Sequence, residues 1–161
     1  MINTNNLNFK IMAVLNWGKP KLEICALENG SMPGVPSWTE LDTPVENSTS
    51  LETTEGEKTE ALDEGGAVVD TRKKKNKYSL KFSLFEKKNK EKPIADEDGV
   101  INTEYAIRLT PEDTSTKGFI IKKASVSYQY TYTTADGGRH VYTFDALQPD
   151  EGKMLEPYSQ G

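Results

Sequence analysis

The feature that most constrains the fold is a pair of long strand-like runs between residues 119 and 147, which flank the turn signal Asp136-Gly137-Gly138. In the first run, even positions from 124 to 132 carry Ala, Val and Tyr, whereas odd positions carry Ser, Gln and Thr. Successive side chains of a strand point to opposite faces, so this run has an apolar, aromatic face and a polar face. The pattern predicts a long β-hairpin.

The aromatic face also predicts the register of this hairpin, because cross-strand partners lie on the same face. A loop with an odd number of residues keeps that face continuous, and we expect Tyr132 opposite Tyr142 and Tyr130 opposite Phe144. The predicted loop is Asp136-Gly137-Gly138, with a glycine at a position of positive φ. At about 3.3 Å per residue the first run spans roughly 50 Å, so it either bends or projects from the body. A projecting β-arm usually meets another subunit.

Shorter alternating runs predict the rest of the architecture. We expect an all-β (mainly β) fold, a β-sandwich or partly open β-barrel of about eight strands with one short helix and a long C-terminal hairpin. Helical potential is limited to residues 86–92 and 111–115. Further strands are expected at residues 8–15, 21–27, 67–71, 78–85 and 105–109, and a polar hairpin at residues 51–62.

Residues 1–161 are expected to form a single domain. Its expected flexible tails are residues 1–6 and 148–161. Residues 30–44, anchored by Trp38, and residues 72–77 are expected to be long loops.

Charge is unevenly distributed along the chain. The net charge is −5, but residues 1–71 carry 4 basic and 12 acidic side chains, residues 72–92 carry 10 and 2, and residues 93–161 carry 6 and 11. A basic segment between acidic flanks suits head-to-tail association of identical copies. The alternative is a solvated hairpin tip.

The single cysteine, Cys25, excludes a disulfide within the chain and any multi-cysteine metal site. It lies in a strand-like run, which indicates a buried thiol. The N-terminus has no basic region followed by an apolar stretch, and the longest apolar run, residues 11–15, is far shorter than a membrane span. We therefore expect a reduced, intracellular, soluble protein.

Motifs that carry chemistry are weak. Residues 56–59 (GEKT) lack the adjacent Gly-Lys pair and the upstream glycine of a phosphate-binding loop. Residues 96–101 partly match a calcium-binding loop. However, Ile94 and Tyr105 occupy its first and twelfth positions, where the loop needs metal ligands. The only histidine, His140, lies on the hairpin and is interpreted as packing or surface. We expect no enzymatic activity, no cofactor and no metal.

Nucleic-acid binding by Lys73, Lys74 and Lys75 is a further possibility. No aromatic residues are interleaved with these lysines and there is no recognition-helix pattern, so specific binding is not expected. A solvated loop or a salt contact between subunits is the better interpretation.

Two stretches resemble a known family. Residues 53–60 (TTEGEKTE), followed by residues 63–66 (DEGG) and 69–71 (VDT), look like the central part of bacteriophage major tail tube proteins. Residues 105–112 (YAIRLTPE) and the long hairpin are similar to tube proteins of phages and prophages of the Bacteroides group. The likeness covers residues 48–147 and contains no catalytic signature.

This resemblance implies a β-sandwich protomer with a short flanking helix. Such protomers form hexameric rings that stack into a hollow tube for phage DNA, and related tubes occur in contractile injection and type VI secretion systems. The implied partners are further copies of the chain, other tail proteins and passing DNA without specific binding, but no membrane. The implied location is the virion tail, assembled in the cytoplasm of the bacterial host.

Within this hypothesis, two groups of residues are candidates for functional surfaces. The assembly candidates are Trp38, Arg72, Lys73, Lys74, Lys75, Lys77, Tyr128, Tyr130 and Tyr132. The candidates for the lumen face are Ser125, Ser127, Gln129 and Thr131.

The alternative function is a soluble β-sandwich binding module for a carbohydrate or protein ligand, without catalysis. Its marker is an exposed aromatic platform of Tyr128, Tyr130 and Tyr142.

Overall fold

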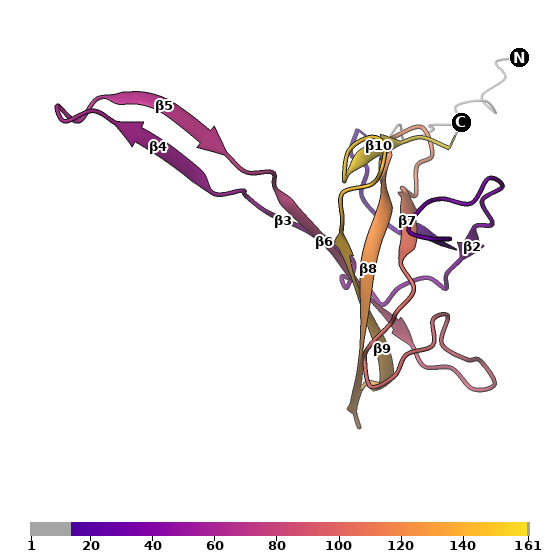
Figure 1. The fold of residues 1–161 in the computed structure, drawn as a ribbon. Coiled ribbons are helices and arrows are strands. Elements are labelled where there is room, and N and C mark those ends of the chain that lie inside the picture. Colours follow the sequence, from indigo (N-terminus) through magenta and orange to yellow (C-terminus); the bar gives the residue numbers. More distant parts are fainter. Residues whose placement is uncertain (1–13, 161) are drawn as a thin grey trace, which may run out of the picture.

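The computed structural model describes residues 14–160, which form ten strands and no helix (Figure 1). The all-β prediction is confirmed, but the strand count is higher than expected. The strands are β1 (Lys21–Ala26), β2 (Thr39–Glu40), β3 (Ser50–Thr54), β4 (Lys58–Leu62), β5 (Val68–Lys73), β6 (Lys77–Phe85), β7 (Tyr105–Thr110), β8 (Gly118–Thr133), β9 (Gly137–Ala146) and β10 (Glu156–Tyr158).

The expected short helix is wrong. Residues 86–92 and 111–115 form turns and bends. Both segments are too short to offset the cost of helix nucleation, and Asn89 adopts a positive φ of 59° in the middle of the first one.

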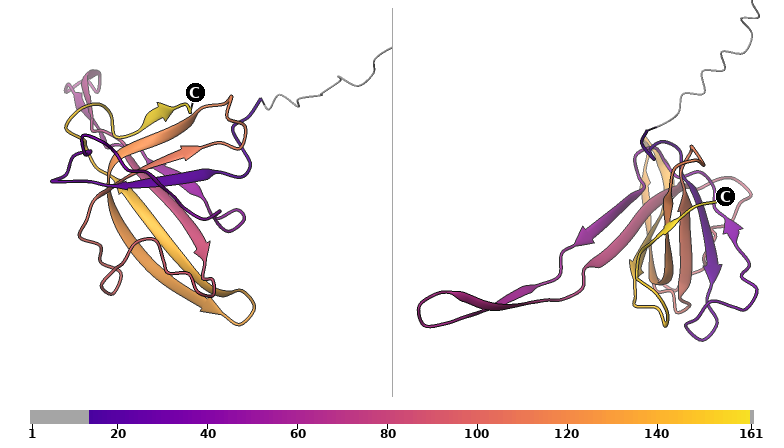
Figure 2. Two further views of the ribbon diagram at one scale, coloured as in Figure 1. Left: turned by 90° about the vertical axis from the view of Figure 1, so that its right-hand side faces the viewer. Right: turned by 90° about the horizontal axis from the view of Figure 1, so that it is seen from above.

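Eight strands belong to one antiparallel sheet in the order β2-β1-β7-β8-β9-β6-β3, with β10 paired to β8. The sheet curls so that its two ends approach each other (Figure 2). Residues 41–45 connect these ends, since Leu41 N donates to Leu22 O at 2.9 Å and Val45 N donates to Ser83 O at 2.8 Å. The result is a partly open, sandwich-like enclosure around one core.

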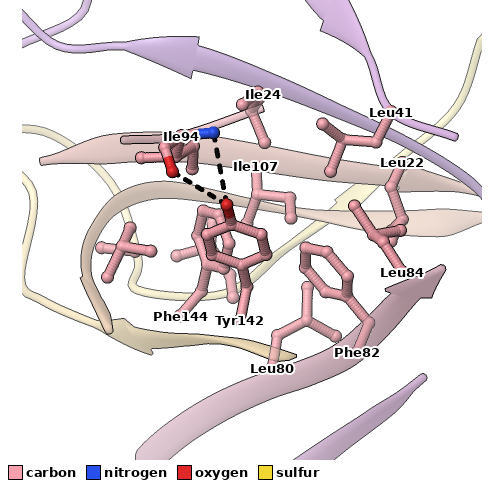
Figure 3. Packing of buried hydrophobic residues seen from close by; sticks show 13 residues of the cluster. Leu22, Ile24, Leu41, Leu80, Phe82, Leu84, Ile94, Ile107, Tyr142 and Phe144 are labelled. Atoms are coloured by element: carbon pink, nitrogen blue, oxygen red, sulfur yellow. Dashed lines mark hydrogen bonds between the residues drawn. The ribbon is translucent and has the colours of Figure 1, made fainter. Parts of the chain in front are cut away.

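The core lies inside this curled sheet. Side chains from β1, β6, β7, β8 and β9 form one buried cluster, and Phe82, Tyr142 and Phe144 are its largest members (Figure 3). The phenol of Tyr142 donates to Ile94 O at 2.9 Å and accepts from Ile94 N at 3.3 Å. This pair of bonds anchors the segment at Ile94 to β9.

The long strand β8 pairs with different strands along its length. Its first half pairs with β7 and β10, and its second half pairs with β9, with Ala124 shared between β7 and β9. A register shift opposite residues 105–107 of β7 inserts an extra residue into β8 at this point. Such a bulge bends a strand and increases its twist, so β8 bends within the sheet.

The β8–β9 turn contains three residues, 134–136, so the expected odd loop is confirmed, but its position is two residues earlier than predicted. Tyr128 therefore lies opposite Tyr142, and Tyr132 lies opposite Gly138. Gly137 takes the positive φ, at 74°, as the first residue of β9. A three-residue turn followed by a glycine in the left-handed region is a usual hairpin geometry, which explains why both glycines belong to the strand.

The expected tails and loops need correction as well. Residues 156–158 are not a loose tail, because they form β10 against β8. Residues 30–44 contain the short strand β2, and residues 72–77 are divided between β5 and β6 with only three residues between these strands. Residues 1–6 and most of the strand expected at residues 8–15 lie outside the described residues.

Candidate functional site

The most unusual element is a two-stranded arm that leaves the body of the molecule. The sheet pairing of β3 with β6 ends at Thr54 and Lys77, and the same two chain segments continue outward as β4 and β5 up to a turn at residues 63–66 (Figure 1). The expected polar hairpin of residues 51–62 is thus wrong: its two halves, β3 and β4, follow one another along the arm and do not pair with each other.

The junction between the two ladders is held by close backbone contacts. Gly56 N donates to Asn76 Oδ1 at 3.0 Å, and Lys74 N donates to Glu57 O at 3.0 Å. A Cβ at position 56 would lie 1.9 Å from Lys74 O, so only glycine permits this approach of the two chains. Residues 56–59, which partly match a phosphate-binding loop, therefore form the structural junction between the body and the arm.

Every residue of β4 and β5 is exposed, and neither strand packs against another strand of the described chain. The turn end of the arm carries Leu62, Val68 and Val69, which are 59%, 52% and 65% exposed. An isolated two-stranded ribbon is at best marginally stable in water, and grouped exposed apolar side chains mark interaction sites. The arm can therefore bind another protein surface along its length and at its end.

The predicted basic residues lie along the half of the arm nearest the body. Arg72 and Lys73 belong to β5, Lys77 begins β6, and Lys74 and Lys75 lie between them. These side chains are exposed on a ribbon and do not form the separate loop that we expected.

Part of the basic charge is paired within the arm. Lys73 forms an ion pair with Glu55 at 3.1 Å, and Lys74 forms one with Glu57 at 3.2 Å. Exposed pairs of this kind contribute about 0–1 kcal/mol each, so a partner surface can replace them at little cost.

The tyrosines of β8 are divided between body and solvent. Tyr128 is half-buried, whereas Tyr130 and Tyr132 are 48% and 64% exposed toward the β8–β9 turn. The last two tyrosines therefore lie on the aromatic face of the strand but outside the core. Tyr142, which the binding-module alternative places at the surface, is fully buried. The platform of Tyr128, Tyr130 and Tyr142 does not exist in this fold.

His140 is the centre of a polar cluster at this end of the sheet. Its Nδ1 lies 2.7 Å from the Tyr128 hydroxyl, and the Lys92 ammonium lies 4.4 Å from the centroid of the Tyr128 ring. Lys92 also pairs with Asp96, and Tyr130 donates a hydrogen bond to Glu86. These contacts lock the loop of residues 86–101 against β8 and β9.

Protonation in this cluster follows from burial and pairing. Burial lowers the pKa of His140, with a smaller opposing effect of Glu86, so the imidazole is neutral at pH 7 and its Nδ1 shares a hydrogen bond with the Tyr128 hydroxyl. The hydrogen bond from Lys92 lowers the pKa of Asp96, and burial raises the pKa of Tyr128.

The candidate lumen residues share one exposed face of β8. Ser125, Ser127, Gln129 and Thr131 are all exposed in the single chain. The basic segment lies on the arm, and its groove at the arm base is formed with residues 148–155 and not with this face.

Trp38, one of the assembly candidates, packs against residues of its own chain. Its ring lies 4.1 Å from the Arg108 guanidinium carbon, which also lies 5.0 Å from the Tyr158 ring. Arg108 forms two hydrogen bonds of 3.1 Å with Glu23. Trp38 also packs beside the buried Cys25, so this cluster joins β1, β7 and β10.

Residues 96–101, which partly match a calcium-binding loop, form a turn whose carboxylate Asp96 is already engaged within the chain. Asp96 accepts a hydrogen bond from Gly99 N at 2.7 Å and pairs with Lys92, and Asp98 has a positive φ of 49°. Across residues 14–160, no group of three or more His, Cys, Asp or Glu side chains is placed to hold a metal ion. The same residues include no helix long and apolar enough to cross a membrane.

No model of a known protein family matches the chain, and no curated protein matches it significantly. Sequence reasoning did not select Leu62, Val68 and Val69. The signal that could have identified them is their position on both sides of the Asp63-Glu64-Gly65-Gly66 turn, next to strand-forming residues.

Proposed function

We propose that this protein is a structural protomer that assembles with copies of itself, and specifically that it is a tail tube subunit of a phage or prophage. Its rings are hexameric and stack into a conduit for phage DNA. The observation that carries the proposal is the arm of residues 55–76, which extends from the body (Figure 2). Its end carries exposed apolar side chains. The resemblance of residues 48–147 to tail tube proteins supports the specific form.

Two further properties of the surface support self-assembly. The β3 strand is an edge of the main sheet, so its outer backbone groups are free to pair with another chain. The arm also has a net negative charge at its turn end and a net positive charge at its base, which gives each copy two different, complementary patches. Patches of this kind form heterologous interfaces, and heterologous interfaces close into rings or continue as filaments.

In the assembled tube, the polar face of β8 with Ser125, Ser127, Gln129 and Thr131 is our candidate for the lumen. Hydroxyl and amide groups have no charge with which to hold phosphates, and the net charge of −5 opposes strong binding of DNA. The location that follows is the virion tail, after assembly in the cytoplasm of the host. The partners are further copies and other tail proteins.

Sedimentation velocity over a hundredfold range of protein concentration tests self-assembly. We expect the sedimentation coefficient of the full chain to rise steeply with concentration. The matched control is a chain in which Leu62, Val68 and Val69 are replaced by Ser, Thr and Thr, which leaves the arm but removes its apolar end. A full-length chain that remains a monomer throughout, like this control, contradicts the proposal.

A further inference from the structure

The two ends of the arm have opposite chemistry. The turn end, residues 60–70, carries 4 acidic and no basic side chains, whereas the end nearest the body, residues 55–59 and 71–77, carries 6 basic and 2 acidic side chains. At the turn end, Asp63, Glu64 and Asp70 form no salt bridge with a described residue. These carboxylates surround the exposed Leu62, Val68 and Val69 and define, together with them, what we call the arm tip.

A groove of about 390 Å³ lies at the other end of the arm, where it joins the body. One wall comes from Lys73, Lys74, Lys75 and Tyr78, and the other comes from the segment before β10, including Lys153 and Leu155. Lys75 donates a hydrogen bond to Gln148, and neither Lys75 nor Lys153 forms a salt bridge with a described residue. The groove therefore combines free positive charge with a partly apolar floor.

The tip of a given chain cannot reach the groove of the same chain. About ten residues of extended ribbon separate the turn from Lys75, which corresponds to roughly 33 Å. A tip that enters such a groove must therefore belong to a different copy.

We propose that the arm tip of one copy docks into the lysine-lined groove at the arm base of a second copy, an inference that rests on the proposed self-assembly. The tip carboxylates meet Lys75 and Lys153, and the tip apolar side chains cover Tyr78, Met154 and Leu155. Because tip and groove are different surfaces, each copy gives one contact and receives one, which produces a head-to-tail series.

A second groove competes for the same occupant. It has a volume of about 810 Å³ and is lined by residues 16–20, 43–47 and 49–51, by Pro111, and by one residue each of β6, β7 and β8. Its apolar lining suits the tip as well, but its charged side chains are one lysine, Lys19, and one glutamate, Glu46. Only the lysine-lined groove complements an acidic tip, and this difference decides between them.

Disulfide trapping tests the contact directly. Val68→Cys places a thiol at the tip, and Met154→Cys places one in the groove. The two variants are mixed under assembling conditions with a mild oxidant. We expect covalent dimers in the mixture and none from either variant alone. The unmodified chain is the background control, since its single thiol, Cys25, is buried.

The outcomes separate this inference from the proposed function. Dimers from Val68→Cys alone indicate contact between two tips and overturn the inference. Assembly without dimers in the mixture, or dimers between Val68→Cys and a Thr49→Cys variant of the larger groove, overturns it as well, while self-assembly stands. A mixture that neither assembles nor forms dimers overturns both.

A charge exchange gives a second readout. Glu64→Lys or Lys153→Glu alone should weaken the apparent assembly constant by up to about fivefold, as expected for one exposed ion pair. The two changes combined should restore part of the loss. The matched controls are Lys88→Glu and Glu28→Lys, which change the same charges outside both surfaces. Equal weakening by the controls, or no recovery in the combined variant, overturns the pairing.

Discussion

At the scale of single residues, the best-defined polar group in the core is the Tyr142 hydroxyl, which satisfies both backbone groups of Ile94. Tyr142→Phe keeps the shape of the ring but leaves these two groups without a partner. We expect a loss of about 1–3 kcal/mol in the free energy of unfolding, measured by urea denaturation. The control is Tyr132→Phe at an exposed position, where we expect a change within about 0.5 kcal/mol. Equal stability of the two variants would show that residues 93–101 are not held by this hydroxyl.

His140 gives the fold a dependence on pH. Burial lowers its folded-state pKa below the ordinary value of 6.5, so the unfolded state binds more protons once the pH falls below 6.5. The stability contributed by the neutral imidazole is complete above pH 6.5 and is lost as the pH falls through the folded-state pKa.

We therefore expect the urea midpoint to decrease from pH 8 to pH 5, and the decrease to be smaller in His140→Asn, whose side-chain amide can still form a hydrogen bond with the Tyr128 hydroxyl. The lowered pKa values of Asp42 and Asp96 act only at more acidic pH, below their ordinary value of 3.8. An identical pH profile of the two proteins between pH 8 and pH 5 would rule out His140 as the titrating group.

The β8–β9 turn depends on one glycine. Gly137 has a φ of 74°, and a Cβ there meets no atom within 4 Å, so a substitution is opposed by the backbone conformation alone. We expect Gly137→Ala to cost roughly 1–2 kcal/mol of stability in thermal or urea unfolding. Gly34→Ala, which meets no nearby atom and has no positive φ, is the control and should change stability little. A neutral Gly137→Ala would show that the turn adopts another geometry.

At the scale of elements, the arm is separable from the body. β4 and β5 contact each other and no other strand, and Thr54 and Lys77 are already partners at the arm base. Residues 56–75 can therefore be replaced by Asn-Gly, a two-residue hairpin turn that continues the β3–β6 register.

We expect this armless chain to unfold cooperatively with a melting temperature close to that of the full chain, as followed by circular dichroism, and to remain monomeric. Loss of the folded body would show that the arm contributes to the core. Assembly equal to that of the full chain would show that the arm is not an interface.

The strands with clear alternation were predictable from the sequence. Residues 78–85 and 105–109 correspond closely to β6 and β7, and the two arms of the long hairpin correspond to β8 and β9. In these elements one face is buried and the other is exposed, so the alternation of apolar and polar residues indicates each strand directly. The same alternation predicted an odd number of residues in the β8–β9 turn. It did not predict the exact position of the turn, because moving the turn by two residues leaves every side chain of both strands on the same face of the sheet.

The arm was not predictable in this way. Both of its faces are in water, so its residues show no period, and the polar runs at residues 51–54 and 59–62 fit either a local hairpin or two successive parts of a ribbon. The basic residues were selected correctly as a surface feature but assigned to a loop. The apolar residues of the tip are separated in the sequence by a polar turn. They lie close together only because β4 pairs with β5, and the composition of the segment does not predict this pairing.

At the scale of the whole molecule, the chain has a closed core and an open periphery. The curled sheet buries its aromatic and aliphatic side chains, while β3 is an edge strand, the arm extends into solvent, and Tyr130 and Tyr132 are exposed. The arm tip and the lysine-lined groove are complementary but too far apart to meet within one chain. This arrangement explains why we assign the function to contacts between copies.

Electron microscopy of the concentrated full-length chain tests this central claim most directly. Self-assembly through different, complementary patches predicts closed rings or hollow tubes of uniform diameter, and the tail tube hypothesis further predicts sixfold symmetry in end-on views. A field of single particles of 18.0 kDa at every concentration, without rings or tubes, would contradict the account.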